Sequence, residues 1–159
     1  MDEIAAKTNL LGLTRVGMEE FVLGMGEKPF RARQLMKWIY RRAVGDFESM
    51  TDLGKDFRRR LEEIAEIRTP QVIVSQSSAD GTRKWLLRLE SGQAIEMVFI
   101  PEPGRGPLCS SGQSGCTMDC TFCSTGQQGF NRNLDTAEIV GQVWLANREL
   151  GYSPDGDRV

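Results

Sequence analysis

Three cysteines, Cys116, Cys120 and Cys123, stand close enough in the sequence to bind one metal centre, with the spacing C-x₃-C-x₂-C. Each iron of a cubane [4Fe–4S] cluster normally takes one thiolate. A motif with only three thiolates leaves one iron open to a substrate, which distinguishes catalytic metal sites from closed structural ones. Phe122, directly before the last cysteine, can shield such a cluster from water. The spacing therefore predicts a [4Fe–4S] cluster with one open iron.

The alternative is a structural zinc ion held by all four cysteines of the chain, with Cys109 as the fourth ligand in a C-x₆-C-x₃-C-x₂-C arrangement. Structural zinc sites usually combine two C-x₂-C pairs or include histidine, and this chain has no histidine. The same absence removes the usual general base, so any proton transfer must be carried out by a carboxylate, a thiol, a lysine or a tyrosine.

One carboxylate stands in an otherwise apolar strand, predicted over residues 93–100. Ile95, Met97 and Phe99 alternate on one face, and Glu96 is the only acid on the other. We expect Glu96 to be at least partly buried, which requires either a partner such as an arginine or a function. Burial would also make it a stronger base.

The elements that position these residues change along the chain. Residues 1–69 show helical periodicity, with Leu35, Trp38 and Ile39 on one stripe and Thr51 as the expected N-cap of a second helix. Strands are predicted from residue 71 to 100 and again over 108–113. A helix capped by Asp135 or Thr136 follows the cysteines, with its apolar stripe formed by Ile139, Val140, Val143 and Trp144.

These patterns predict an α/β chain with two domains, 1–69 and 70–159. The strand, cysteine segment and final helix are typical of the first β/α unit of a barrel, here incomplete. No apolar stretch is long enough to span a bilayer and the N-terminus has no signal-peptide pattern, so we expect a cytoplasmic protein without membrane contact.

Positive charge is concentrated in the helical part. Residues 28–60 contain ten Lys or Arg and four acids, a local net charge of +6 in a chain whose total is −2. Such a segment indicates either a surface that faces a polyanion or a solvated helix face, and composition does not separate the two.

The segment from Cys116 to Cys123 matches the C-x₃-C-x-φ-C signature of radical S-adenosylmethionine enzymes, with Phe122 at φ. Its flanks, residues 124–134 and 138–144, closely resemble the RlmN-type adenine-C2 methyltransferases of ribosomal and transfer RNA. Residues 29–35 and 96–102 resemble the same family, so the resemblance covers most of the chain. It implies a radical S-adenosylmethionine barrel preceded by a small accessory domain that helps engage RNA.

The resemblance also implies roles for individual residues. Cys116, Cys120 and Cys123 would hold the cluster that cleaves S-adenosyl-L-methionine, and Glu96 would act as the general base on the methyl-bridged intermediate. Cys109 would form a transient disulfide with the methyl-carrying cysteine. One S-adenosylmethionine would methylate that cysteine, and a second would give the 5′-deoxyadenosyl radical. The implied partners are 23S rRNA, tRNA and an external, flavodoxin-like electron donor, and we expect a monomer.

Two departures from the family pattern accompany the resemblance. Ser110, Gly112 and Ser114 stand where the family usually has Val, Ser and Val, which should weaken the strand before the cluster. The glycine-rich cofactor strand and the methyl-carrying cysteine have no counterpart before Val159, so we expect a fragment of a longer enzyme. The remaining alternatives are an adenine-C8 rRNA methyltransferase and a non-catalytic RNA-binding module with a structural zinc.

Overall fold

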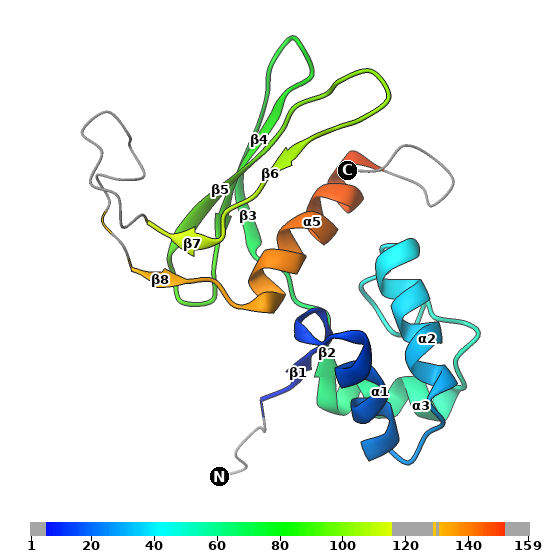
Figure 1. The fold of residues 1–159 in the computed structure, drawn as a ribbon. Coiled ribbons are helices and arrows are strands. Elements are labelled where there is room, and N and C mark those ends of the chain that lie inside the picture. Colours follow the sequence, from blue (N-terminus) through cyan, green and yellow to red (C-terminus); the bar gives the residue numbers. More distant parts are fainter. Residues whose placement is uncertain (1–5, 116–128, 130, 152–159) are drawn as a thin grey trace.

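The computed structural model describes residues 6–115, 129 and 131–151. The first part of the chain is mainly helical. It contains α1 (Arg15–Gly24), α2 (Phe30–Met36), the π-helical turn η2 (Lys37–Arg41) and α3 (Lys55–Ile64), together with a short 3₁₀ turn, η1 (Leu10–Gly12). Two short strands, β1 (Thr8–Asn9) and β2 (Ala65–Glu66), pair in parallel and bring the two ends of this helical part together (Figure 1).

The helical part has its own hydrophobic core, and the sequence pattern predicts much of it. Leu35, Trp38 and Ile39 are buried as expected from their spacing. The expected cap at Thr51 is wrong, because α3 begins at Lys55 after Gly54. Ile64, at the end of α3, is 44% exposed. The residues between Thr51 and Lys55 form turns, and this places Leu53 in the core without a helix.

Beyond Pro70 the chain forms a four-stranded antiparallel sheet. Its strands follow one another in the order β3 (Gln71–Ser77), β4 (Arg83–Arg88), β5 (Ala94–Phe99) and β6 (Leu108–Cys109). The β3–β4 turn contains Gly81 at φ 86°, a backbone conformation that glycine adopts without steric cost. Neighbouring strands are thus connected by turns or loops, as is usual in antiparallel sheets.

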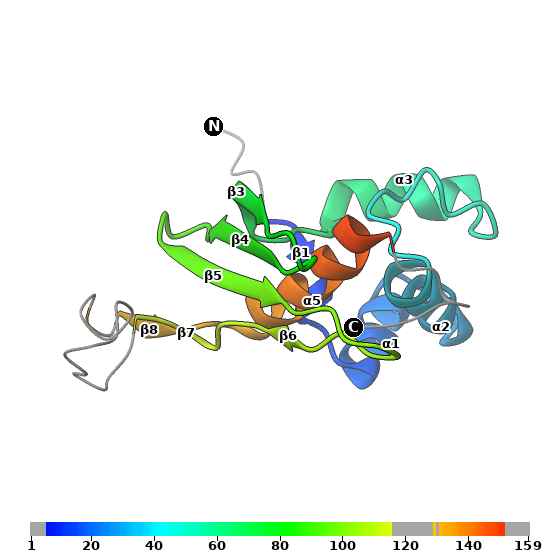
Figure 2. The same ribbon diagram turned by 90° about the horizontal axis from the view of Figure 1, so that it is seen from above.

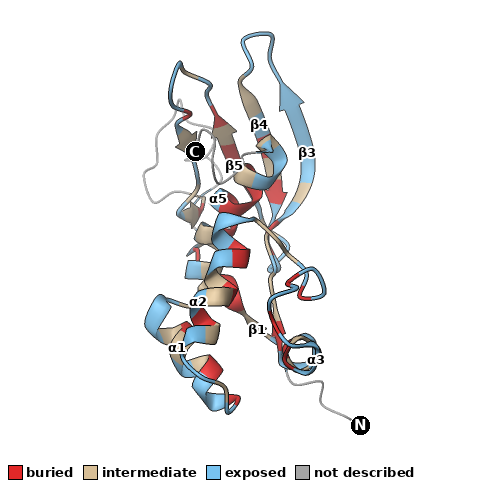
Figure 3. Ribbon diagram, turned by 90° about the vertical axis from the view of Figure 1, so that its right-hand side faces the viewer, coloured by how far each residue is buried: buried red, intermediate tan, exposed pale blue. Residues whose placement is uncertain are grey.

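Only one face of this sheet is covered by the described residues. Trp85 and Leu87 of β4 and Met97 of β5 are fully buried, and they form a second core with residues of the last helix. The opposite face carries Glu96 of β5 and is exposed to solvent. Strand β3 is largely exposed along its length (Figure 3).

The last helix, α5 (Thr136–Leu150), joins the two cores. Asp135 is its N-cap, and Glu138 completes a capping box by accepting a hydrogen bond from the Asp135 N–H. Trp144 belongs to the core of the helical part, whereas Leu145 and Ala146 pack against the sheet. Figures 1 and 2 show α5 between the sheet and the helices of the N-terminal part.

The predicted stripe of α5 is only partly correct. Trp144 is buried, but Ile139 and Val143 are 37% and 38% exposed. The buried face consists of Gly141, Gln142, Trp144, Leu145 and Ala146. The helix packs on two sides, so its contacts do not follow the single apolar stripe that hydropathy indicates.

The strand expected over residues 108–113 is interrupted. Strand β6 pairs with β5, and after a short gap β7 (Gln113–Ser114) pairs with β8 (Arg132–Asn133). The predicted α/β class is confirmed by this mixture of helices and strands. The domain boundary at residue 69 stays a prediction, since α5 contributes to both cores.

Candidate functional site

The open face of the sheet brings together two of the residues singled out in the sequence. In the antiparallel register Val98 of β5 lies opposite Cys109 of β6, and Glu96 is two residues from Val98 on the same face. Diagonal neighbours of this kind have Cα atoms about 7–8 Å apart, within reach of long side chains. Cys109 is exposed and carries a free thiol. A carboxylate and a thiol therefore share one solvent-facing surface.

The expectation that Glu96 is at least partly buried is wrong, because the residue is exposed. Its side chain is 53% exposed, and Glu96 Oε1 forms an ion pair of 2.8 Å with Lys84 Nζ from the neighbouring strand. The apolar residues that suggested burial, Ala94 and Ile100, are also exposed on this face. In an antiparallel sheet one face can remain solvated while the other is packed, and here α5 covers only the other face.

The four remaining site residues, Cys116, Cys120, Phe122 and Cys123, lie outside the described residues. The flanks of the segment that contains them are described. The Ser114 carbonyl accepts a hydrogen bond of 2.9 Å from the Asn131 N–H, and β7 pairs with β8. The two ends of the segment are therefore held side by side. The donor set itself, three thiols without histidine, fits a [4Fe–4S] cluster with one iron left open, because each iron normally takes one thiolate.

Helix α5 anchors the outgoing end of this segment through an ion pair. Arg132 donates to both carboxylate oxygens of Glu138, at 2.6 and 2.9 Å. Hydrogen bonding from Arg132 lowers the pKa of Glu138 below the usual value of a glutamate. The same pairing raises the pKa of Arg132. A bidentate arginine–carboxylate contact fixes geometry as well as supplying energy.

The incoming end is anchored by Gln142, which is fully buried. Its Oε1 accepts a hydrogen bond of 2.8 Å from the Ser111 N–H, and its Nε2 donates one of 2.8 Å to the Ser111 carbonyl. Sequence reasoning missed Gln142 and Glu138. Their i, i+4 spacing beside an apolar stripe was the available signal, because it places two polar groups on one side of the helix.

The basic segment, residues 28–60, contains both paired and unpaired side chains among the described residues. The arginines at 58, 59 and 60 are engaged within the helical part: Arg58 donates to the Glu48 carbonyl, Arg59 pairs with Asp56, and Arg60 pairs with Glu27. By contrast, an exposed set on the α2–η2 helix forms no ion pair with the described residues. This set consists of Arg33, Lys37 and Arg41.

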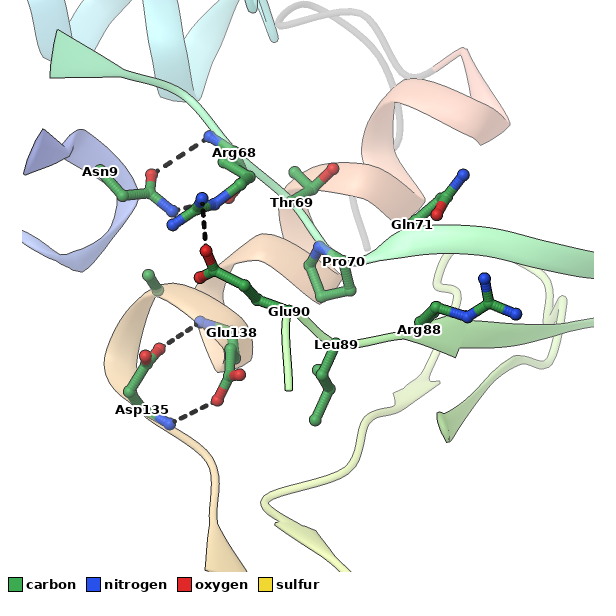
Figure 4. Close-up of a pocket in the computed structure, with 11 residues that line it drawn as sticks. Asn9, Arg68, Thr69, Pro70, Gln71, Arg88, Leu89, Glu90, Asp135 and Glu138 are labelled. Atoms are coloured by element: carbon green, nitrogen blue, oxygen red, sulfur yellow. Dashed lines mark hydrogen bonds and ion pairs between the residues drawn. The ribbon is translucent and has the colours of Figure 1, made fainter. Parts of the chain in front are cut away.

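A cavity of about 320 Å³ lies where the helical part, the sheet and α5 meet (Figure 4). Arg68 crosses its rim, forming an ion pair of 2.9 Å with Glu90, and its carbonyl accepts a hydrogen bond of 2.8 Å from the Asn9 amide. Asp135 and Glu138 line its other side. Neither Glu96 nor Cys109, the two predicted site residues that the structure describes, lines this cavity.

Known proteins are similar to this chain along nearly its whole length. Residues 8–67 match the family described as the ribosomal RNA large subunit methyltransferase N-terminal domain. A curated dual-specificity RNA methyltransferase RlmN of Pseudomonas putida strain F1 is 55% identical over 154 residues, which is 97% of this chain and 40% of the relative. The corresponding protein of Pseudomonas entomophila is also 55% identical, over 97% of this chain and 41% of its own length.

A solved structure shows the same fold. A radical SAM methyltransferase from Sphaerobacter thermophilus superposes with a TM-score of 0.83 at 36% sequence identity, over 94% of this chain and 45% of that one. The chain thus spans about two fifths of the length of the curated relatives it matches. Within residues 6–115, 129 and 131–151, no helix is long and apolar enough to cross a membrane.

Residues 8–67 are therefore similar to the ribosomal RNA large subunit methyltransferase N-terminal domain, and nearly the whole chain is similar to about two fifths of dual-specificity RNA methyltransferases RlmN and to part of a radical SAM methyltransferase.

Proposed function

We propose that this chain is part of a radical S-adenosylmethionine enzyme that methylates C2 of adenine in 23S rRNA and tRNA, through a methylated cysteine of the protein. The observation that carries the proposal is the 55% identity to dual-specificity RNA methyltransferases over 97% of the chain, in a chain that itself contains the three-cysteine motif. The proposed enzyme is a cytoplasmic monomer that receives electrons from a flavodoxin-like donor.

In this proposal Cys116, Cys120 and Cys123 hold a [4Fe–4S] cluster, and Phe122 excludes water from it. A cluster held by these residues would supply the one-electron reduction of S-adenosyl-L-methionine, which is the source of the radical that activates the methyl group. The paired strands β7 and β8 support this assignment, because they keep the two ends of the cysteine segment together.

Glu96 is the proposed proton acceptor. Its carboxylate lies on the open face of the sheet, accessible to a substrate, and the Lys84 ammonium holds Oε1 at 2.8 Å. A general base must come within hydrogen-bond distance of the proton it takes. We propose that substrate binding on this face brings the adenine C2 of the methyl-bridged intermediate to the other carboxylate oxygen of Glu96, while Lys84 orients the carboxylate.

Cys109 is the proposed partner of the methyl-carrying cysteine. Its thiol is exposed and lies diagonally across from Glu96, so a disulfide formed there would release the product on the same face as the proton transfer. The Cys109 thiolate would attack the sulfur of the methyl-carrying cysteine, and the S–S bond would form as the bond from that sulfur to the methyl carbon breaks. The electron pair of the broken bond would stay on that carbon, which would take up the proton lost by the Cys109 thiol to complete the methyl group of the product.

The cofactor assignment is tested by anaerobic reconstitution of the 159-residue chain, followed by iron, sulfide and zinc analysis. We expect about four irons and four sulfides per chain, and loss of both in Cys116→Ala, with the helical circular dichroism signal retained. Cys109→Ala is the matched control and should retain the cluster. One zinc per chain without sulfide would refute the radical mechanism and favour the zinc-bound RNA-binding module.

The RNA interface is proposed for the α2–η2 face, where Arg33, Lys37 and Arg41 are exposed without ion-pair partners among the described residues. Phosphate binding is salt-dependent, so log affinity falls as log salt rises. Removing one phosphate-binding cation makes this fall less steep, by a little under one unit of slope. Replacing all three with Gln should therefore lower the slope for a tRNA by about two to three. Arg59→Gln, which breaks an exposed pair with Asp56, is the control and should change it little. An unchanged slope in the triple variant would exclude this face.

A further inference from the structure

Gln142 is the largest polar side chain among the fully buried residues that the structure describes, and it lies on a helix face that otherwise packs apolar groups. A buried amide is costly unless its groups are hydrogen-bonded. Both ends of this amide are satisfied, by Ser111 through the two bonds described above and by the Glu138 carbonyl at 3.2 Å. An apolar residue of similar volume would fill the same space without these requirements.

The two bonds to Ser111 go to the N–H and the carbonyl of a single residue. This is the pattern by which a neighbouring strand would pair with an extended backbone. It is specific for register, because a shift of one residue turns each side chain to the opposite face and presents another residue's groups. The amide of Gln142 thus replaces a strand partner at one defined residue.

Ser111 lies in the gap between β6 and β7, where the chain leaves one pairing partner and joins another. Cys109 pairs with β5 before the gap, and Gln113 pairs with β8 after it. The Ser111 hydroxyl also donates a bond of 2.8 Å to the Glu96 carbonyl. One residue therefore connects α5, through Gln142, to the backbone that carries Glu96.

We propose that Gln142 is a positioning residue that fixes the register of residues 109–113 and so sets where Cys109 and strand β7 stand relative to Glu96. The chemical roles of Cys109, Glu96 and the cysteines rest on the proposed function, whereas the register itself does not. Together with Glu138, which holds Arg132, the amide makes α5 the support of both ends of the segment.

The test compares the wild-type 159-residue chain with Gln142→Met, which keeps the length of the side chain and removes its hydrogen bonds. Amide hydrogen exchange, followed by mass spectrometry, is measured for peptides covering 108–114, the helical part and the β3–β4 hairpin. We expect exchange in 108–114 to become about tenfold faster, as for loss of about one to two hydrogen bonds. The alkylation rate of Cys109 by iodoacetamide, read on its own peptide, should change with it.

The control is Val143→Met, which changes the neighbouring, partly exposed position of the same helix and should leave both measurements unchanged. A general structural role for Gln142 predicts faster exchange in all three sets of peptides. A positioning role predicts faster exchange confined to 108–114, with exchange in the helical part and the β3–β4 hairpin unchanged. Exchange in Gln142→Met equal to wild type, or unfolding of the whole chain, would overturn the inference.

The metal content of the reconstituted wild-type chain separates this inference from the proposed function. Zinc without sulfide in the wild type refutes the radical mechanism, yet the exchange result still decides the role of Gln142. Iron and sulfide in the wild type, with unaltered exchange in Gln142→Met, refutes only the positioning role.

Discussion

Trp144 gives a quantitative test of how α5 connects the two parts of the chain. Its indole Nε1 donates a buried hydrogen bond of 2.7 Å to the carbonyl of Ile39, 105 residues earlier in the sequence. The ring belongs to the core of the helical part, although the helix that carries it also packs on the sheet. Trp144→Phe removes the donor and part of the ring while leaving an aromatic side chain.

The cost of this change follows from two contributions. Loss of a hydrogen bond that leaves a buried carbonyl unpaired costs about 1–3 kcal/mol. Removal of part of a buried ring adds a cavity term, which for full truncation of Trp or Phe to Ala brings the total to about 3–5 kcal/mol. We expect Trp144→Phe to lower the free energy of unfolding by about 2–3 kcal/mol.

The assay is urea unfolding of the 159-residue chain followed by circular dichroism at 222 nm. With an m value of about 2 kcal/mol/M, the midpoint should fall by about 1–1.5 M. Arg148→Ala is the control, because its guanidinium lies over the same ring, 5.6 Å from the ring centroid, and losing this contact should cost well under about 1 kcal/mol. A loss below about 0.5 kcal/mol in Trp144→Phe would refute the view that this bond ties the last helix to the helical part.

Three further predictions concern the surroundings of the site. Because the pKa of Glu138 is lowered in the folded state, its contribution to stability is present above the ordinary pKa of glutamate and disappears as pH falls through the lowered value. The stability difference between wild type and Glu138→Gln should therefore shrink on acidification, and a constant difference would contradict the ion-pair argument. Asp135→Ala should cost about 1 kcal/mol through loss of the N-cap, and Asp135→Asn, which can still cap, should recover most of it in the same urea assay. Gly106→Ala should destabilise by about 1–3 kcal/mol because the new Cβ would overlap the Phe99 ring, whereas Gly24→Ala, with open space around it in α1, should be neutral or stabilising.

Much of the local structure could be predicted from residues that lie close together in the sequence. The cysteine spacing and the alternation of Trp85, Leu87 and Leu89 are local patterns, and the burial of those three follows from the strand period of two. The N-cap at Asp135 and the helix end at Gly151 were likewise predictable, because caps depend on a few neighbouring residues.

The position of Glu96 could not be obtained in this way. Hydropathy indicated burial, because Glu96 is surrounded by apolar residues in the sequence. Only the packing of α5 on the Met97 face decided which side of the sheet is covered, and this left Glu96 in solvent beside Lys84. Hydrophobic patterning shows that a strand has two faces and does not identify the element that covers each one.

The sequence by itself therefore determined the α/β class, the cysteine motif and the family resemblance, because each depends on residue types at fixed local spacing. Tertiary structure alone decided that Cys109 and Glu96 share one face, that Arg33, Lys37 and Arg41 are exposed while Arg58–Arg60 are engaged, and that Gln142 holds Ser111. Each of these features depends on which elements pack together, and the residues involved lie up to tens of positions apart in the sequence. Local spacing does not specify that packing.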